Sequence, residues 1–314
     1  MRNAEGGMRK EAEPTIVAGD SRSAFSIHPS AFPSPSYLSV FWMFARNSLI
    51  RDMTFRTNFL IEAVSSATWA LMNLGFYTLL FDLMYRDGAG GPGQIAGWGK
   101  FEFFVFIATT MLVNSLVQAF FMPNAEELSE LTRTGGLDFA LLKPIDTQFL
   151  VSLQKVSWSS FGNLFLALGL LAYSLPRIEG LTLSPLQVVL YPLYVVTGTL
   201  ILYSIMIALA ATSIWLGRNQ SLYDFWFYIT NFSRYPMEIY EGPYGTPLRR
   251  LFTFVIPILV VINVPAAILA KPFSADNPYR MYLAGFALVA TAASLAMSRW
   301  IFQRALLSYR SASS

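Results

Sequence analysis

The chain has 314 residues, of which 54% are hydrophobic and only 13% are charged. Soluble domains carry about 25% charged residues, and the mean hydropathy here is +0.46. This composition excludes a disordered or nucleic-acid-coating protein, argues against a soluble enzyme, and indicates a chain that lies partly in a lipid bilayer. There are no cysteines and one histidine, His28, so disulfides and thiol nucleophiles are excluded and His-based catalysis nearly so.

The first segment, residues 1–35, is rich in Ala, Ser, Pro and Gly and predicts a disordered cytoplasmic tail. It has no apolar core of the kind that a signal peptide requires. Residues 36–57 differ, because apolar side chains such as Phe41 and Phe44 alternate there with Arg46 and Arg51. This pattern predicts an amphipathic helix in the membrane interface. The alternative is a cytoplasmic extension of the first membrane span.

Long apolar runs must form helices in lipid, because lipid offers no partner for free backbone groups. Five runs predict transmembrane helices: 58–81, 101–122, 156–176, 185–217 and 281–302. The last run carries small residues suited to close helix packing, namely Ala284, Ala287, Thr291, Ser294 and Ser298.

Residues 218–280 allow two topologies. In one, 218–248 is a cytoplasmic loop and 249–270 is a full fifth span, which Arg249 and Arg250 favour by the positive-inside rule. In the other, 221–236 is a short fifth span and 249–270 enters and leaves the membrane from outside. Pro257 and Pro265 interrupt that run and favour the re-entrant alternative.

Both topologies give six spans and the same orientation. Fourteen Lys and Arg residues lie on the side of the N-terminus, five lie on the other side, and Arg234, Arg249 and Arg250 depend on the topology. The basic side is therefore cytoplasmic, with both termini inside and the chain integral to the plasma (inner) membrane.

The sequence contains no motif that predicts an enzyme. The Gly97-Trp98-Gly99-Lys100 sequence lacks the first glycine of a P-loop, and Phe101 stands where Ser or Thr would coordinate magnesium. Any ATP and magnesium would therefore be bound by another subunit, and no cofactor is expected in this chain. A secondary transporter or channel that needs no ATPase is the alternative function, but it would be expected to carry ionisable residues in mid-span, whereas Glu62 and Glu102 lie at span ends.

The segment after the second span has the pattern of a docking element. Pro123 predicts the start of a short helix with glutamates in its first turns, and Gly135-Gly136 predicts its end. Leu137, Leu141 and Leu142 add an apolar patch. A plain connecting loop remains the simpler interpretation of this segment alone.

The motifs in this segment carry a resemblance to a known family. The string Gly135-Gly136-Leu137-Asp138 with Leu142-Lys143-Pro144 resembles the loop between the second and third spans in permeases of type-2 ABC exporters. The uncharacterised daunorubicin- or viologen-exporter-like branch is the most similar, also through Arg234-Tyr235-Pro236, Phe254 to Pro257 and the C-terminal Tyr309 to Ser314. The resemblance covers about residues 36–314.

This resemblance implies an all-α membrane domain over 36–314 with six transmembrane helices, an interfacial elbow helix at 36–54 and a re-entrant segment before the last span. It implies ATP-driven export through two cytoplasmic ATPase subunits and a second permease copy or homologue. The residues expected to contact the ATPase, or to shape the turn that does so, are Glu126, Glu127, Leu131, Gly135, Gly136, Asp138, Lys143 and Pro144. An outer re-entrant motif would comprise Arg234, Tyr235, Pro236 and Pro257. Polar span residues that could line a substrate path, or equally hold helices together, are Asn73, Asn114, Gln118 and Asn163.

Overall fold

The structure is a computed structural model that describes residues 36–54, 56–86, 93–216, 220–271 and 278–309. Within these ranges the chain forms helices joined by turns and contains no β-strand, as the sequence predicts. The predicted tail, 1–35, and the end of the C-terminal motif, 310–314, lie outside the described residues.

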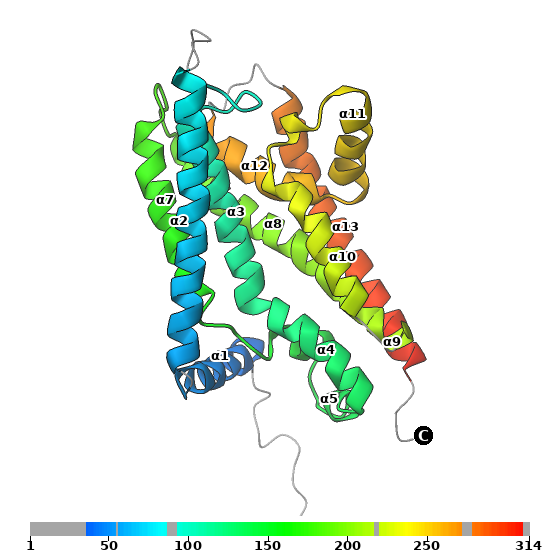
Figure 1. Ribbon diagram of the computed structural model, residues 1–314. Helices are drawn as coiled ribbons and strands as arrows, with labels where there is room; N and C mark the ends of the chain where they lie inside the picture. The colour runs from blue at the N-terminus through cyan, green and yellow to red at the C-terminus, as the bar shows by residue number, and fades with distance from the viewer. Residues whose placement is uncertain (1–35, 55, 87–92, 217–219, 272–277, 310–314) are drawn as a thin grey trace, which may run out of the picture. The chain divides into compact units, whose positions relative to one another are not determined.

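In its described part, the N-terminal half of the chain supplies the helices α1 to α7, most of which are labelled in Figure 1. They are α1 (Tyr37–Thr54), α2 (Arg56–Arg86), α3 (Lys100–Phe120), α4 (Met122–Thr134), α5 (Leu137–Leu141), α6 (Thr147–Leu153) and α7 (Phe161–Ser174). α3 packs along α7, and α2 lies against both, with many of its apolar side chains left exposed. Helix α7 begins five residues after the predicted start of the third span, because residues 156–158 instead bond to α1 and α3.

The C-terminal half supplies the centre of the buried core. Its helices are α8 (Pro185–Ala211), α9 (Ser213–Leu216), α10 (Gln220–Asn231), α11 (Gly242–Arg250), α12 (Ile258–Ala270) and α13 (Pro278–Ser308), with a π-helical turn over Leu251–Val255. α8 packs along both α12 and α13. Four of the five small residues expected on the packing face of α13 are buried, namely Ala284, Ala287, Thr291 and Ser298.

The close approach of α8 and α12 depends on one glycine and one proline. Pro265 was expected to break this segment, but it lies inside α12, which continues through it. Its missing N–H leaves the carbonyl of Val261, four residues earlier, without a helical donor. That carbonyl faces Gly198 of α8, where an added Cβ would lie only 2.5 Å from the oxygen. The neighbouring helix therefore covers the carbonyl that Pro265 exposes.

Pro257 does interrupt the helix, as predicted. The segment Gly242–Val255 and helix α12 meet at 88°, and Pro257 is the residue before α12. Residues 249–270 are therefore not one straight helix. Arg234 ends the short helical turn Phe232–Arg234 that follows α10, and Tyr235 and Pro236 come directly after it.

Among the residues that the structure describes, three helical stretches are long and apolar enough to cross a membrane: Lys100–Thr134, Pro185–Leu216 and Pro278–Ser308. The bent pair of α11 and α12 raises this number to four if it is counted as one span. α7 and α10, with 14 and 12 residues, are shorter than the roughly 20 residues that a bilayer requires. The predicted count of six spans is therefore not confirmed by helix length and composition.

Candidate functional site

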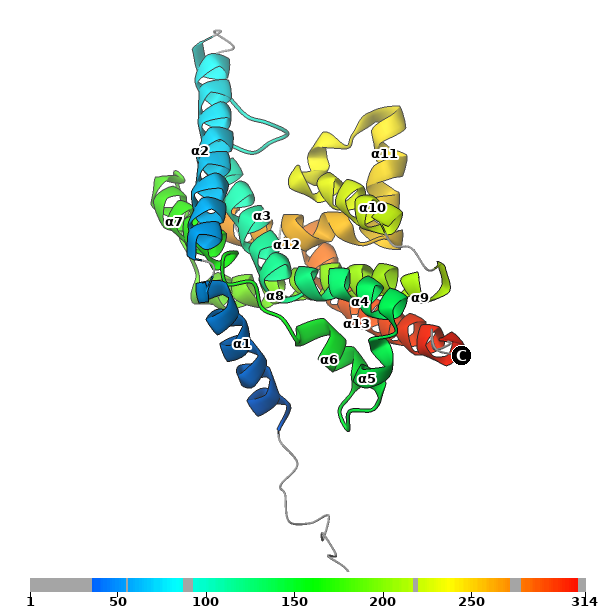
Figure 2. The ribbon, with the colours of Figure 1, turned by 60° about the horizontal axis from the view of Figure 1, so that its bottom comes forward.

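The segment between α3 and α7 folds as a small helical unit. We call residues 122–153, which comprise α4, α5 and α6, the α4–α6 segment (Figure 2). α4 has Pro123 in its first turn and ends at Gly135, whose φ of 75° places it in the left-handed conformation that favours glycine. The helix and its glycine stop thus agree with the sequence prediction. An added Cβ at Gly136 would meet the end of the Leu131 side chain at 2.9 Å, so a larger residue there would require Leu131 to shift.

The base of α4 is clamped to the chain that leaves the segment. The buried amide of Asn124 donates to the carbonyl of Lys155 (2.7 Å) and accepts from its backbone N–H (2.8 Å). The ammonium of Lys155 pairs with Glu127 at 2.8 Å. Since both backbone groups of Lys155 are bonded to one side chain, the two ends of the segment are held together.

A second attachment joins the segment to α13. Asp146 precedes α6 and accepts from the backbone N–H of Phe149 (2.9 Å), which caps that helix. Its carboxylate also takes two hydrogen bonds from the guanidinium of Arg299 on α13, one of them 3.0 Å long, and Gln148 accepts from the same guanidinium at 3.0 Å. These bonds from Arg299, aided by the N–H of Phe149, hold the pKa of Asp146 below its ordinary value against the opposing effect of burial.

A third attachment joins the chain beyond α6 to α1. The backbone N–H of Val156 donates to Ser48, and that of Trp158 donates to Asp52 (both 3.1 Å). The indole of Trp158 donates to the carbonyl of Ala45 at 3.1 Å. Both arginines of α1 with described side chains, Arg46 and Arg51, are exposed. The α4–α6 segment and α1 therefore form one bonded assembly at the C-terminal end of α3.

The tip of the segment is apolar and exposed. Leu128 and Leu137 are fully buried, whereas Phe139 is 73% exposed and Leu142 is 81% exposed. Lys143 and Pro144 follow on the exposed side. Phe139 was not among the predicted contact residues. It lies close in sequence to the buried Leu137, and only the fold of α5 shows that the two side chains differ in exposure.

The other predicted contact residues are divided between surface and interior. Glu126 is exposed, Asp138 is half-buried in the first turn of α5, and Leu131 packs against the core. Glu127 forms an ion pair with Lys155.

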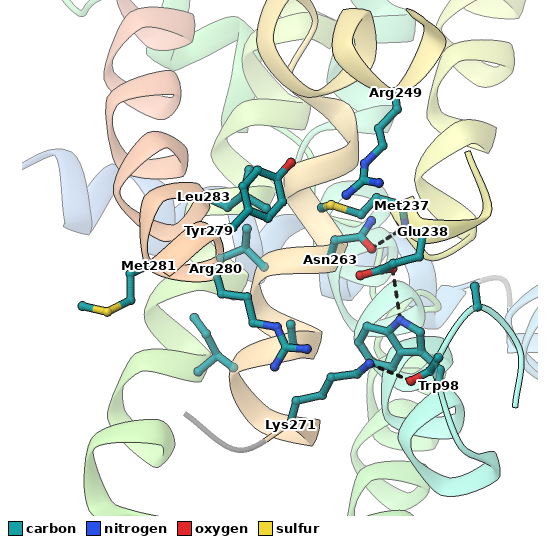
Figure 3. Close-up of a pocket in the computed structure, with 15 residues that line it drawn as sticks. Trp98, Met237, Glu238, Arg249, Asn263, Lys271, Tyr279, Arg280, Met281 and Leu283 are labelled. Atoms are coloured by element: carbon teal, nitrogen blue, oxygen red, sulfur yellow. Dashed lines mark hydrogen bonds between the residues drawn. The ribbon is translucent and has the colours of Figure 1, made fainter. Parts of the chain in front are cut away.

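A pocket of about 350 Å³ lies at the opposite end of α3 and α13 (Figure 3). The turn before α3 contributes Trp98, the segment after α10 contributes Glu238, and α12 contributes Asn263. Glu238 accepts a hydrogen bond from the indole of Trp98 at 3.1 Å. Asn263 accepts from the backbone N–H of Met237 (2.8 Å) and so fixes this segment to α12.

Three basic residues also line the pocket, Arg249, Lys271 and Arg280. The ammonium of Lys271 donates to the carbonyl of Gly97 (2.8 Å) and lies 4.3 Å from the centre of the Trp98 ring. Burial lowers the pKa of Lys271, and Arg280 lowers it further, although Glu102 and Glu238 oppose this. The sequence could not reveal this group, because members such as Trp98 and Arg280 are 182 positions apart.

The four polar span residues do not meet in this pocket. Asn73 donates to the carbonyl of Trp69 on its own helix (2.9 Å), Gln118 is exposed on α3, and Asn114 and Asn163 are half-buried. Of the predicted outer motif, Arg234 lies exposed beside the ring of Phe227, and Pro236 is buried. Neither lines the pocket as the described residues define it.

The long apolar helices and the bent pair define the chain as an integral membrane protein. A family model described as ABC-2 family transporter protein matches residues 71–313, which is most of the chain. The chain therefore belongs to the ABC-2 transporter family and is a permease component of an ABC transporter, a class that works with partner ATPase subunits. Comparisons with curated proteins and with solved structures give no match.

Proposed function

We propose that this chain is the membrane-spanning permease subunit of an ATP-driven exporter and that it receives the motion of its ATPase through the α4–α6 segment. ATP and magnesium would be bound in the ATPase alone. The resemblance to daunorubicin- and viologen-exporter-like permeases is the reason for proposing export.

The observation that carries this proposal is an apolar tip on a firmly attached base. Phe139 and Leu142 present large apolar surfaces, which a partner protein would cover more favourably than water. The base is bonded to α13 through Asp146 and, through the chain beyond α6, to α1. A push on the tip would therefore reach a long apolar helix of the membrane domain directly.

The proposed topology has six spans: α2, α3, α7, α8, α10 and α13. α1 would be the interfacial elbow helix, with its exposed arginines among the lipid headgroups. The bent pair of α11 and α12 would be re-entrant from outside. Residues 1–35 would form a cytoplasmic tail, 36–314 the permease domain, and the chain would pair with a second permease in the inner membrane with both termini inside.

Co-purification tests the proposed partner. The tagged chain in mild detergent should bring down an ATPase subunit, and the double variant Phe139→Ser, Leu142→Ser should lose it. Tyr244→Ser is the matched control, because Tyr244 is 88% exposed on α11 at the other end of the fold. Retention of the ATPase by the double variant would show that the tip is not the docking surface.

Cysteine labelling tests the topology, since the chain has no cysteine of its own. A Tyr244→Cys variant should react with an impermeant maleimide added outside the cell. Reaction only after the membrane is opened would overturn the re-entrant arrangement and support a cytoplasmic loop over 218–248.

A further inference from the structure

The pocket at the start of α13 gathers positive charge from three separate elements. Arg249 comes from α11, Lys271 follows α12, and Arg280 lies in the first turn of α13. Figure 3 shows the two guanidinium groups and the ammonium directed toward the same hollow. Since these residues are not neighbours in sequence, the fold itself brings the three cations together.

The negative charge at this site is smaller. Among the described residues that line the pocket, Glu238 is the single carboxylate, and one of its oxygens is already bonded to Trp98. Glu241 reaches Arg249 at 3.2 Å, but its own side chain is largely exposed. Three cations therefore line the pocket against one carboxylate. Burial is the main cause of the lowered pKa of Lys271; the repulsion from Arg280 adds to it but is smaller than the opposing attraction of Glu102 and of Glu238.

From this charge, the cavity and its lining we propose that the pocket binds a phosphate-bearing headgroup. Arginine is well suited to phosphate, because its planar guanidinium donates two parallel hydrogen bonds to phosphate oxygens. Apolar side chains also line the pocket, among them Val264, Ile268 and Leu283. A cavity of about 350 Å³ with both basic and apolar lining residues fits a glycerophosphate group.

The position of Arg280 favours a lipid as the source of this phosphate. Arg280 is the third residue of α13, which is long and apolar enough to cross the bilayer. A residue in the first turn of a spanning helix lies at the depth of the headgroups, where anionic lipids are bound by basic side chains. The same chemistry would also accept a free phosphate, so the test separates the two sources.

Binding is measured on the purified full chain in a neutral detergent by native mass spectrometry and by thermal shift. Phosphatidylglycerol is compared with phosphatidylcholine at equal mole fraction, and sodium phosphate is compared with sodium chloride at equal ionic strength. The wild type should prefer phosphatidylglycerol. Arg280→Gln should weaken this binding about tenfold, the loss expected when one charge-assisted contact is removed.

Arg250→Gln is the matched control, because Arg250 is the exposed neighbour of Arg249 and does not line the pocket. It should keep wild-type binding to within about twofold, the scatter expected of a surface charge outside the site. Arg280→Lys retains the charge and should bind phosphatidylglycerol with intermediate affinity. It replaces Arg280→Gln in the measurement if the glutamine variant is unstable. A phosphate effect that depends on Arg280 without a lipid effect would support the site with a free anion as its ligand. An equal loss of binding in Arg250→Gln and Arg280→Gln would overturn the proposal. So would the absence of any preference both for phosphatidylglycerol over phosphatidylcholine and for phosphate over chloride.

Discussion

Replacing Asp146 by Asn isolates the ion pair that joins the α4–α6 segment to α13. Asparagine is also a good helix cap, so the bond to the N–H of Phe149 should survive. The variant loses the charge that faces Arg299, while Gln148 still accepts from that guanidinium. Its effect therefore measures the pair and not the cap.

The expected magnitude is small but measurable. Opposite charges about 4 Å apart attract by roughly 1 kcal/mol in water and roughly 4 kcal/mol at an effective dielectric constant of 20. The side chains of Arg299 and Asp146 are 43% and 30% exposed, and solvent and the cost of ordering reduce the net effect. We expect Asp146→Asn to lower the free energy of unfolding by about 1 kcal/mol, and the melting temperature by about 2 °C.

The assay is a double-mutant cycle of melting temperatures in detergent with Asp146→Asn, Arg299→Gln and the combination. Because the pKa of Asp146 is lowered in the folded state, the pair stabilises the fold fully above the unfolded pKa of about 3.9 and loses this effect as pH falls through the folded pKa. The difference between wild type and variant should thus be present at pH 7 and decline only as the pH falls below about 4. Glu130→Gln, which breaks an exposed pair with Arg133, is the control and should change nothing. Strictly additive effects at pH 7 would refute the reasoning.

Three further substitutions test the packing by thermal unfolding. Asn124→Ala leaves both part-buried backbone groups of Lys155 without their side-chain partner and should cost about 1–3 kcal/mol, and a loss under 1 kcal/mol would contradict the clamp. Gly198→Ala forces a Cβ to within 2.5 Å of the Val261 carbonyl and should cost at least about 1–3 kcal/mol, so a neutral result would show that α8 and α12 are not so close. Gly135→Ala strains a residue with φ of 75° and should cost about 1 kcal/mol, whereas a stabilised protein would exclude the left-handed turn.

Local chemistry explains what the sequence could predict. The helix that begins near Pro123 and ends at Gly135 depends on residues within one segment, as does the break at Pro257. Pro265 was misjudged because its effect depends on α8. Gly198 lets that helix cover the exposed carbonyl, and no pattern within 249–270 contains this information.

The candidate sites depend more on tertiary structure. The positions of Glu126 and Glu127 on α4 follow from sequence, but only the fold shows that Glu127 is paired with Lys155 while its neighbour is exposed. The pocket was not foreseen at all. Lys271 reaches the carbonyl of Gly97 across 174 positions, and pairs of that separation leave no periodic signal.

Cross-linking from the tip tests the coupling proposal most directly. In this cysteine-free chain, Leu142→Cys can carry a photoactivated cross-linker in native membranes, with Tyr244→Cys as the control from the opposite end. We expect a cross-link between Leu142→Cys and an ATPase subunit, with ATP altering its yield, and no such product from Tyr244→Cys. An ATPase captured from Tyr244→Cys but not from Leu142→Cys would contradict the coupling proposal.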